Sequence, residues 1–209
     1  MDDKARRLRR LMLSTGVVLL LGSIVGLFWL NYKLKQIVEQ SSSPALPVLV
    51  QLPSFLLMER SRKPIGLDDL RGSVWIADFI FTRCPGPCPL MSSRMFKLQE
   101  AFREEASLRL VSISVDPEFD SPEVLREYAE RFQAKEGRWL FLTGEKARIH
   151  ALAQSGFLVG DIQDLTVHST RFILVDRRGR IRGYYDSQDE EDIQRLIHDA
   201  KVLLREAES

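Results

Sequence analysis

The longest uncharged stretch of the chain lies near its start, between two unequal groups of basic residues. Residues 11–30 carry no charge; five Lys or Arg residues precede them, and only Lys33 and Lys35 follow closely. Twenty helical residues span about 30 Å, the thickness of a bilayer's hydrocarbon core. A cleaved signal peptide has a shorter apolar region and a small-residue cleavage site, so the pattern predicts an uncleaved anchor. The charge asymmetry places the N-terminus in the cytoplasm.

The anchor divides the chain into four predicted parts. These are a cytoplasmic N-terminus at 1–10, a transmembrane anchor at 11–32, a linker at 33–46 and one folded domain at 47–209. Ser and Pro residues at 41–47 are typical of a tether. The remaining stretch of about 160 residues is enough for a domain with its own core. We expect this domain on the outer side of the inner (cytoplasmic) membrane, in an oxidising periplasm or its equivalent.

Strand-like and helix-like segments alternate along the predicted domain at 47–209. Residues 74–81 are almost continuously apolar, as in a strand that is covered on both faces, and 108–115 form a second predicted strand that ends at Asp116 and Pro117. Helix-like runs lie at 92–105, 121–132 and 145–155, strand-like runs at 171–175 and 179–185 form a hairpin, and a last helix has apolar residues at helical spacing from Ile193 to Leu204. This order predicts an α/β, thioredoxin-like fold, with a central mixed sheet and flanking helices, behind a single transmembrane helix.

The charge pattern argues against nucleic acid as a partner. The formal net charge is +1, and basic residues beyond the N-terminus alternate with acidic ones instead of forming a patch. The basic cluster at 4–10 adjoins the apolar span. We therefore interpret it as a topology signal and a contact with the lipid bilayer.

Cys84 and Cys88 are the only cysteines of the chain. A strand-like run leads into them and a helix-like run leads out, so both thiols are expected near a helix N-terminus, where backbone N–H groups favour thiolate. A disulfide between them would close a very short loop and stabilise the fold little. The pair is better explained as a redox couple or a soft-metal chelate, and an oxidising compartment would tend to close it into a disulfide.

Three histidines are candidates for a further ligand. His150 and His198 lie within helix-like runs and are interpreted as solvated surface residues. His168 differs because it precedes the strand at 171–175. Thioredoxin-like oxidoreductases carry a cis-proline before this strand, facing their cysteines, and here Ser169 stands at that position. His168 is therefore expected beside the cysteine pair, the alternative being a loop histidine with an ordinary hydrogen bond.

Two thiolates and one imidazole form a soft set of three ligands. Such sets select Cu(I), zinc or iron–sulfur clusters. Two cysteines are too few for an ordinary cluster, and zinc requires a fourth ligand or water. Copper accepts three ligands as Cu(I), and imidazole also suits Cu(II).

Four segments together resemble the Sco/SenC family of membrane-anchored, thioredoxin-like copper proteins. They lie at 77–89, 111–118, 139–144 and 168–181, and their order and spacing cover nearly all of the outer domain. The resemblance implies a metallochaperone that carries Cu(I), Cu(II) or both and assists assembly of the binuclear copper centre of cytochrome c oxidase. Its expected partners are the copper-centre subunit of the oxidase and a copper donor or thiol reductant protein.

The resemblance also implies roles for individual residues. Cys84, Cys88 and His168 fall on the copper ligands of the family. Asp116 falls on an acidic residue near the site, with a strand-end turn carboxylate as the alternative. Asp78, inside an apolar strand, is either a buried, hydrogen-bonded carboxylate or a group near the ligands that tunes the thiols.

Other functions remain open for the same cysteines. A thiol–disulfide oxidoreductase could keep a partner's copper-site cysteines reduced, although the missing cis-proline beside His168 argues against a general reductase. A thioredoxin-like peroxidase needs an activated cysteine with Arg and Thr nearby. Thr82 and Arg83, directly before Cys84, superficially meet this requirement. A structural or signalling domain with an incidental disulfide is the simplest alternative. We expect a metallochaperone rather than an enzyme, with thiol reductase activity as the alternative.

Overall fold

The computed structural model describes residues 22, 25–33, 46–159 and 170–206. The chain divides into two units, Met1–Ala45 and Leu46–Ser209. The described residues of the first unit are helical. No helix within the described ranges is both long enough and apolar enough to cross a membrane. The predicted anchor at 11–32 falls largely outside those ranges.

The described part of the second unit is built around one mixed sheet of eight strands. In chain order they are β1 (Val50–Gln51), β2 (Leu56–Glu59), β3 (Pro64–Gly66), β4 (Val74–Ile80), β5 (Leu108–Ser114), β6 (Trp139–Thr143), β7 (Arg171–Val175) and β8 (Arg180–Asp186). Their order across the sheet is β1-β8-β7-β4-β5-β6-β2-β3. The three central strands β4, β5 and β6 are parallel, and the other neighbours are antiparallel.

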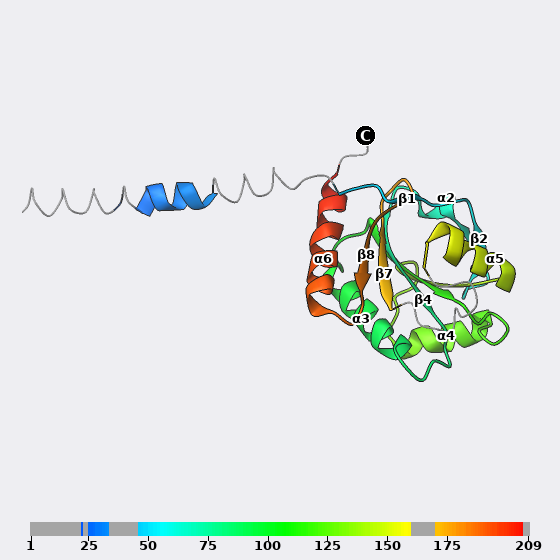
Figure 1. The fold of residues 1–209 in the computed structure, drawn as a ribbon. Coiled ribbons are helices and arrows are strands. Elements are labelled where there is room, and N and C mark those ends of the chain that lie inside the picture. The colour runs from blue at the N-terminus through cyan, green and yellow to red at the C-terminus, as the bar shows by residue number, and fades with distance from the viewer. Residues whose placement is uncertain (1–21, 23–24, 34–45, 160–169, 207–209) are drawn as a thin grey trace, which may run out of the picture. The chain divides into compact units, whose positions relative to one another are not determined.

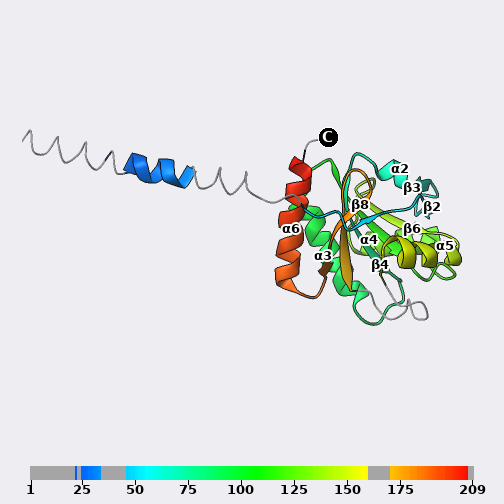
Figure 2. The same cartoon turned by 45° about the horizontal axis from the view of Figure 1, so that its top comes forward.

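Helices cover both faces of this sheet (Figures 1 and 2). They are α2 (Leu67–Leu70), α3 (Cys88–Ala101), α4 (Pro122–Arg131), α5 (Lys146–Ala151), the π-helical turn η1 (Leu152–Gly156) and α6 (Glu190–Arg205). One hydrophobic cluster joins the sheet to α3, α4 and α6, and a second joins it to α2, α5 and η1. We call these two sides of the sheet the α3 face and the α5 face.

Strand β4 supplies both clusters because its side chains alternate between the two faces. All seven of its residues are buried. Ile76 and Ile80 belong to the cluster on the α3 face, whereas Trp75 and Phe79 belong to the one on the α5 face. Asp78 shares the parity of Ile76 and Ile80, so this acidic residue lies on the α3 face, in the middle of an otherwise apolar strand.

The predicted strands at 74–81, 108–115 and 171–175 and the hairpin are confirmed within a residue or so at each end. Gly179 has φ +74 in the turn between β7 and β8, a conformation that favours glycine. The cap of α4 is also as predicted, because the Ser121 hydroxyl accepts a hydrogen bond from the Val124 N–H.

Several elements differ from the prediction. Helix α3 begins at Cys88 instead of Ser92, since proline fixes φ near helical values at the start of a helix and the Met91 N–H bonds the Pro87 carbonyl at 2.9 Å. The helix expected over 145–155 is α5 followed by η1. The strands β1, β2, β3 and β6 and the helix α2 were not predicted, and the buried β6 entered only as part of the family pattern.

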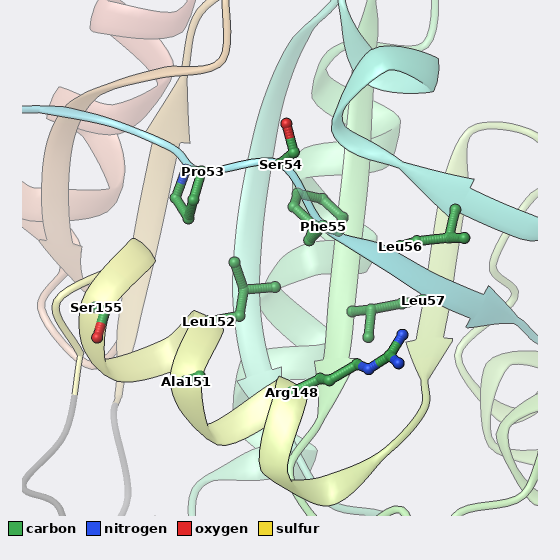
Figure 3. A pocket seen from close by; sticks show the side chains of 9 residues that line it. All are labelled: Pro53, Ser54, Phe55, Leu56, Leu57, Arg148, Ala151, Leu152 and Ser155. Carbon is green, nitrogen blue, oxygen red and sulfur yellow. The ribbon is translucent and has the colours of Figure 1, made fainter.

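A groove of about 380 Å³ lies between β2 and the α5–η1 segment (Figure 3). Its lining is mostly apolar, from Pro53, Phe55, Leu56, Leu57, Ala151 and Leu152, with Ser54, Ser155 and Arg148 as the polar members. Cys84, Cys88, Asp78 and Asp116 are not among them. The groove lies on the α5 face, whereas both cysteines belong to the cluster of the α3 face.

Candidate metal centre

The cysteine pair occupies the turn that joins β4 to α3. Cys88 is the first residue of α3, and Cys84 lies in the turn before it, where its N–H donates to the Phe81 carbonyl at 3.1 Å. Open α/β sheets place their sites at the carboxyl ends of strands, and this turn follows the carboxyl end of β4. The structure thus confirms the predicted position of both cysteines.

Both thiols are free and belong to the hydrophobic cluster of the α3 face. Only 6% of Cys84 and 3% of Cys88 is exposed. Burial, together with the neighbouring Cys84 thiol, raises the pKa of Cys88 to about 12. The expectation that the helix N-terminus would favour thiolate is therefore wrong for Cys88 in the metal-free protein, because burial in an apolar cluster outweighs the helix dipole.

Asp78 is a buried carboxyl group close enough to the pair to contribute to the raised pKa of Cys88. Burial raises the pKa of Asp78 itself to about 7, which the Ser112 hydroxyl opposes only in part. Neither carboxyl oxygen has a partner of good hydrogen-bond geometry within the described chain. Ser112 pairs with Asp78 in the β4–β5 register, and its hydroxyl accepts the Trp139 indole N–H at 2.9 Å. The burial predicted for Asp78 is confirmed, and both of its predicted roles, as a structural carboxyl group or as a group that tunes the thiols, stay predictions.

A second buried polar pair lies on the helices above the sheet. The hydroxyls of Ser92 on α3 and Tyr128 on α4 are 2.9 Å apart. Burial raises the pKa of the Tyr128 phenol, with smaller contributions from Cys88 and Asp78. Sequence reasoning missed both residues, which look like ordinary members of amphipathic helices.

Asp116 lies beside the cysteine turn, at the end of β5. Its carboxylate forms an ion pair with Arg83, the residue before Cys84, at 2.6 Å. The Arg83 guanidinium also lies over the ring of Phe119, 4.2 Å from its centroid. The Asp116 side chain is 21% exposed and that of Arg83 is 58% exposed, so this contact is on the surface.

Asp120, on the same loop, is fully buried and was not predicted. Its Oδ1 accepts the Thr82 hydroxyl at 2.5 Å, and its Oδ2 accepts the Thr82 N–H at 3.1 Å and the Ser114 hydroxyl at 2.5 Å. No local signal distinguishes this carboxylate, because its position before Ser121 and Pro122 is typical of any helix start. Only the folded chain brings Thr82 to it.

The predicted third ligand, His168, lies outside the described residues. His198 is exposed, as expected for a surface residue, whereas His150 is half-buried. Within the described ranges, no group of three His, Cys, Asp or Glu side chains is placed so that it could hold a metal ion. Cys84 and Cys88 are thus the predicted ligands that the structure brings together.

The fold and the cysteine turn define a class: an α/β domain with a Cys-x-x-x-Cys pair where a central parallel strand meets a helix N-terminus. The sequence model of the SCO1/SenC family matches residues 49–205. The chain belongs to the SCO1/SenC family. A relative is the SCO1 protein homolog of Bacillus subtilis, 32% identical over 161 residues that cover 74% of this chain and 83% of the relative.

Solved structures agree with this assignment. A SCO1/SenC family lipoprotein from Bacillus anthracis has 34% identity and a TM-score of 0.69, over 75% of this chain and 96% of that one. BsSco, described as a member of the Sco family of cytochrome c oxidase assembly proteins with a disulfide switch, has 31% identity and the same TM-score, over 76% and 95%. These likenesses confirm the mixed-sheet, thioredoxin-like fold.

Proposed function

We propose that the protein is a copper-binding metallochaperone that assists assembly of the binuclear copper centre of cytochrome c oxidase. The observation that carries the proposal is the pair of free, buried thiols of Cys84 and Cys88 at one helix start. Thiolate sulfur selects Cu(I) over harder metals. The family supports the proposal, since BsSco is described as belonging to the cytochrome c oxidase assembly proteins.

His168 is the proposed third ligand, beside Cys84 and Cys88. The sheet register supports it: β7 runs antiparallel to β4, and Ala77 pairs with Ile173. The start of β7 therefore lies at the end of β4 that leads to Cys84. His168 precedes that start by three residues.

Copper binding must displace protons from this site, because metal-bound cysteine is thiolate. In the metal-free protein the raised pKa of Cys88 keeps its thiol protonated at neutral pH. Loading with copper therefore releases a proton from Cys88, and the affinity for copper rises with pH. Delivery of copper then proceeds by ligand exchange with the cysteines of the acceptor.

Asp78 and Asp116 are proposed to act around the ligands. Asp78 is buried close to Cys88, and its charged form, which predominates above about pH 7, disfavours the Cys88 thiolate until copper compensates that charge. Asp116 holds Arg83, next to Cys84, through the surface ion pair. These contacts support roles in tuning and orienting the thiols rather than in binding the ion directly.

We also propose the membrane arrangement predicted from the sequence. Residues 1–10 lie in the cytoplasm, 11–32 span the inner membrane, 33–46 form a linker, and the domain at 47–209 lies on the outer side. Support comes from the uncharged run and the excess of basic residues before it. In this arrangement the domain meets the copper-centre subunit, and a copper donor or thiol reductant serves Cys84 and Cys88.

A thiol–disulfide oxidoreductase is the second candidate function. It is favoured by two adjacent free thiols and by the disulfide switch described for BsSco. In this role the pair would reduce a disulfide of the acceptor and become a Cys84–Cys88 disulfide, which a reductant must reopen. The two roles are compatible, because thiols must be reduced before they bind copper.

The direct test is copper titration of the reduced domain at 47–209, comparing wild type with Cys84→Ala, His168→Ala and His198→Ala. His198, exposed on α6, is the matched control for loss of an imidazole. We expect one copper ion per wild-type and His198→Ala chain, and weaker binding with an altered Cu(II) spectrum in the other two. Unchanged affinity and spectrum in His168→Ala would exclude His168 as a ligand. Rapid turnover of a generic disulfide substrate, independent of His168, would favour the oxidoreductase.

A further inference from the structure

The buried carboxylate of Asp120 connects the two loops at the carboxyl ends of β4 and β5. Its three hydrogen bonds come from Thr82 on the cysteine turn, through both N–H and hydroxyl, and from Ser114 at the end of β5. Thr82 lies two residues before Cys84. The contact therefore fixes the turn close to the first thiol.

The backbone around Asp120 is itself held in place. The Asp120 N–H donates to the Asp116 carbonyl at 2.8 Å, and the Val115 N–H donates to the Ile80 carbonyl at 2.8 Å. The Ser114 hydroxyl, which donates to Asp120, also accepts the Asp116 N–H at 3.1 Å. The carboxylate thus extends from a rigid loop, and through it the cysteine turn takes the position that this loop dictates.

The three hydrogen bonds of Asp120 are strongest when the acceptor is a carboxylate. Hydrogen bonds to a charged acceptor are stronger than neutral ones, and a buried charge is tolerated only when such bonds compensate it. All three groups around Asp120 are donors. An asparagine would place a neutral oxygen and an N–H₂ group there, toward which the Thr82 hydroxyl must turn as acceptor, so Asp120→Asn replaces charge-assisted bonds with weaker neutral ones while preserving the volume.

Arg83 connects the same two loops from the outside, but its ion pair with Asp116 is exposed to solvent. Exposed pairs contribute little, and salt screens them. Asp120 is fully buried and holds the backbone as well as the side chain of Thr82. Of these two side-chain connections, the one through Asp120 is therefore the stronger.

We propose that Asp120 is a positioning residue: through Thr82 it fixes Cys84 relative to Cys88, so that both sulfurs face one ion. The link to copper rests on the function proposed above, whereas the effect on Cys84 itself does not. Groups that hydrogen-bond a metal ligand directly are typically worth about 10–100-fold in metal affinity, and Asp120 acts one step further away, through Thr82. We therefore expect Asp120→Asn to weaken copper binding about tenfold, at the lower end of that range.

The experiment uses the reduced protein without copper and then with it. Iodoacetamide alkylation is followed separately at Cys84 and Cys88 by mass spectrometry, and each variant rate is divided by the wild-type rate at the same cysteine. Absorption of Cu(II)–thiolate charge transfer is then recorded. Asp199→Asn is the control, since Asp199 accepts the Tyr185 hydroxyl at 2.7 Å and lies on α6, outside both loops.

Positioning predicts a selective result. Asp120→Asn should accelerate alkylation of Cys84 at least about tenfold more than that of Cys88, which α3 still holds, and should shift the charge-transfer band. Asp199→Asn should change neither the ratio nor the band. Equal acceleration at both cysteines would show general loosening and overturn the proposal, as would no acceleration at either cysteine.

Two provisions keep the test decisive. If Asp120→Asn does not fold, Thr82→Val, which removes only the hydroxyl bond, is judged by the same selective ratio. If the wild-type protein binds no copper, the proposed function fails, and the alkylation ratio still decides whether Asp120 positions Cys84. If copper binds with the same affinity and spectrum in wild type and Asp120→Asn, positioning for copper is excluded.

Discussion

The two faces of the central strands bury different chemistry. On the α5 face, the buried side chains of β4 and β5 are all apolar: Trp75, Ala77, Phe79, Val111 and Ile113, while the half-buried Arg109 reaches the Asp69 carbonyl at 3.1 Å. On the α3 face the same strands alternate apolar residues with Asp78, Ser112 and Ser114, all fully buried. Both cysteines lie on this second face.

The difference separates what holds the fold from what the site requires. Buried polar groups cost stability unless they are paired, so a sequence selected for stability alone would resemble the α5 face. The α3 face retains an acid, Asp78, whose oxygens have no partner of good hydrogen-bond geometry in the described chain, close enough to Cys88 to raise the pKa of that thiol. Buried polar groups without good hydrogen-bond partners are expected where a functional site needs them.

The largest expected effect tests the apolar face. Phe157 is fully buried, and its ring lies edge-on to Trp75 and Phe79, with centroids 6.0 Å and 5.2 Å away. Phe157→Ala should lower the free energy of unfolding by about 3–5 kcal/mol, from lost burial and the remaining cavity. Urea unfolding measures this. Copper stoichiometry of the folded variant should be unchanged; a variant that stays stable but no longer binds copper would contradict the division between faces.

The next effect tests the polar face through pH. The pKa of Asp78 is raised to about 7, so between about pH 4 and 7 the folded protein keeps a proton that the unfolded chain releases. Stability is therefore lost as the pH rises through this window and is fully retained below it. Asp78→Asn lacks this loss. Its free energy of unfolding, relative to that of wild type, should therefore rise by up to about 4 kcal/mol from pH 4 to pH 8.

Urea unfolding of the reduced, metal-free protein at pH 4, 6 and 8 measures this difference. Asp116→Asn is the control, because it removes a carboxylate from the same end of the sheet and leaves the buried carboxyl group of Asp78 in place. A difference between wild type and Asp78→Asn that stays constant with pH would show that Asp78 is not held protonated by burial.

The same comparison explains what the sequence could predict. The strand at 74–81 was predicted because its apolar run is local, and Cys84 and Cys88 followed from their position after it. Asp78 stood out within that run, and its burial is confirmed. The family pattern added the linked motifs, which the match over 49–205 bears out.

What the sequence could not supply depends on contacts between distant residues. Asp120 acquires its role from Thr82, 38 positions away, and Tyr128 meets Ser92 across 36. The pKa of Cys88 was predicted in the wrong direction because a helix N-terminus is visible in the sequence and burial in the folded core is not. The short strands β1, β2 and β3 lack a periodic pattern long enough to recognise.

A smaller effect concerns the Ser92–Tyr128 pair on the polar face. Tyr128→Phe removes one hydroxyl and leaves that of Ser92 buried without this partner, so it should lower the free energy of unfolding by about 1–2 kcal/mol. Ser92→Ala and the double variant complete a cycle. The coupling energy should be about 1 kcal/mol, and additive single effects would show that the two hydroxyls do not interact.

The smallest effect separates the two connections between the cysteine turn and the β5–α4 loop. Arg83→Ala removes the exposed ion pair with Asp116, so it should change the free energy of unfolding by less than about 1 kcal/mol, and the change should shrink as salt is added. Urea unfolding at low and high salt measures it, with Arg71→Ala, from another exposed pair, as the matched control. A salt-independent loss for Arg83→Ala as large as the loss for Asp120→Asn, measured in the same way, would mean that the outer contact holds the turn as strongly as the buried carboxylate, because only a desolvated interaction escapes screening.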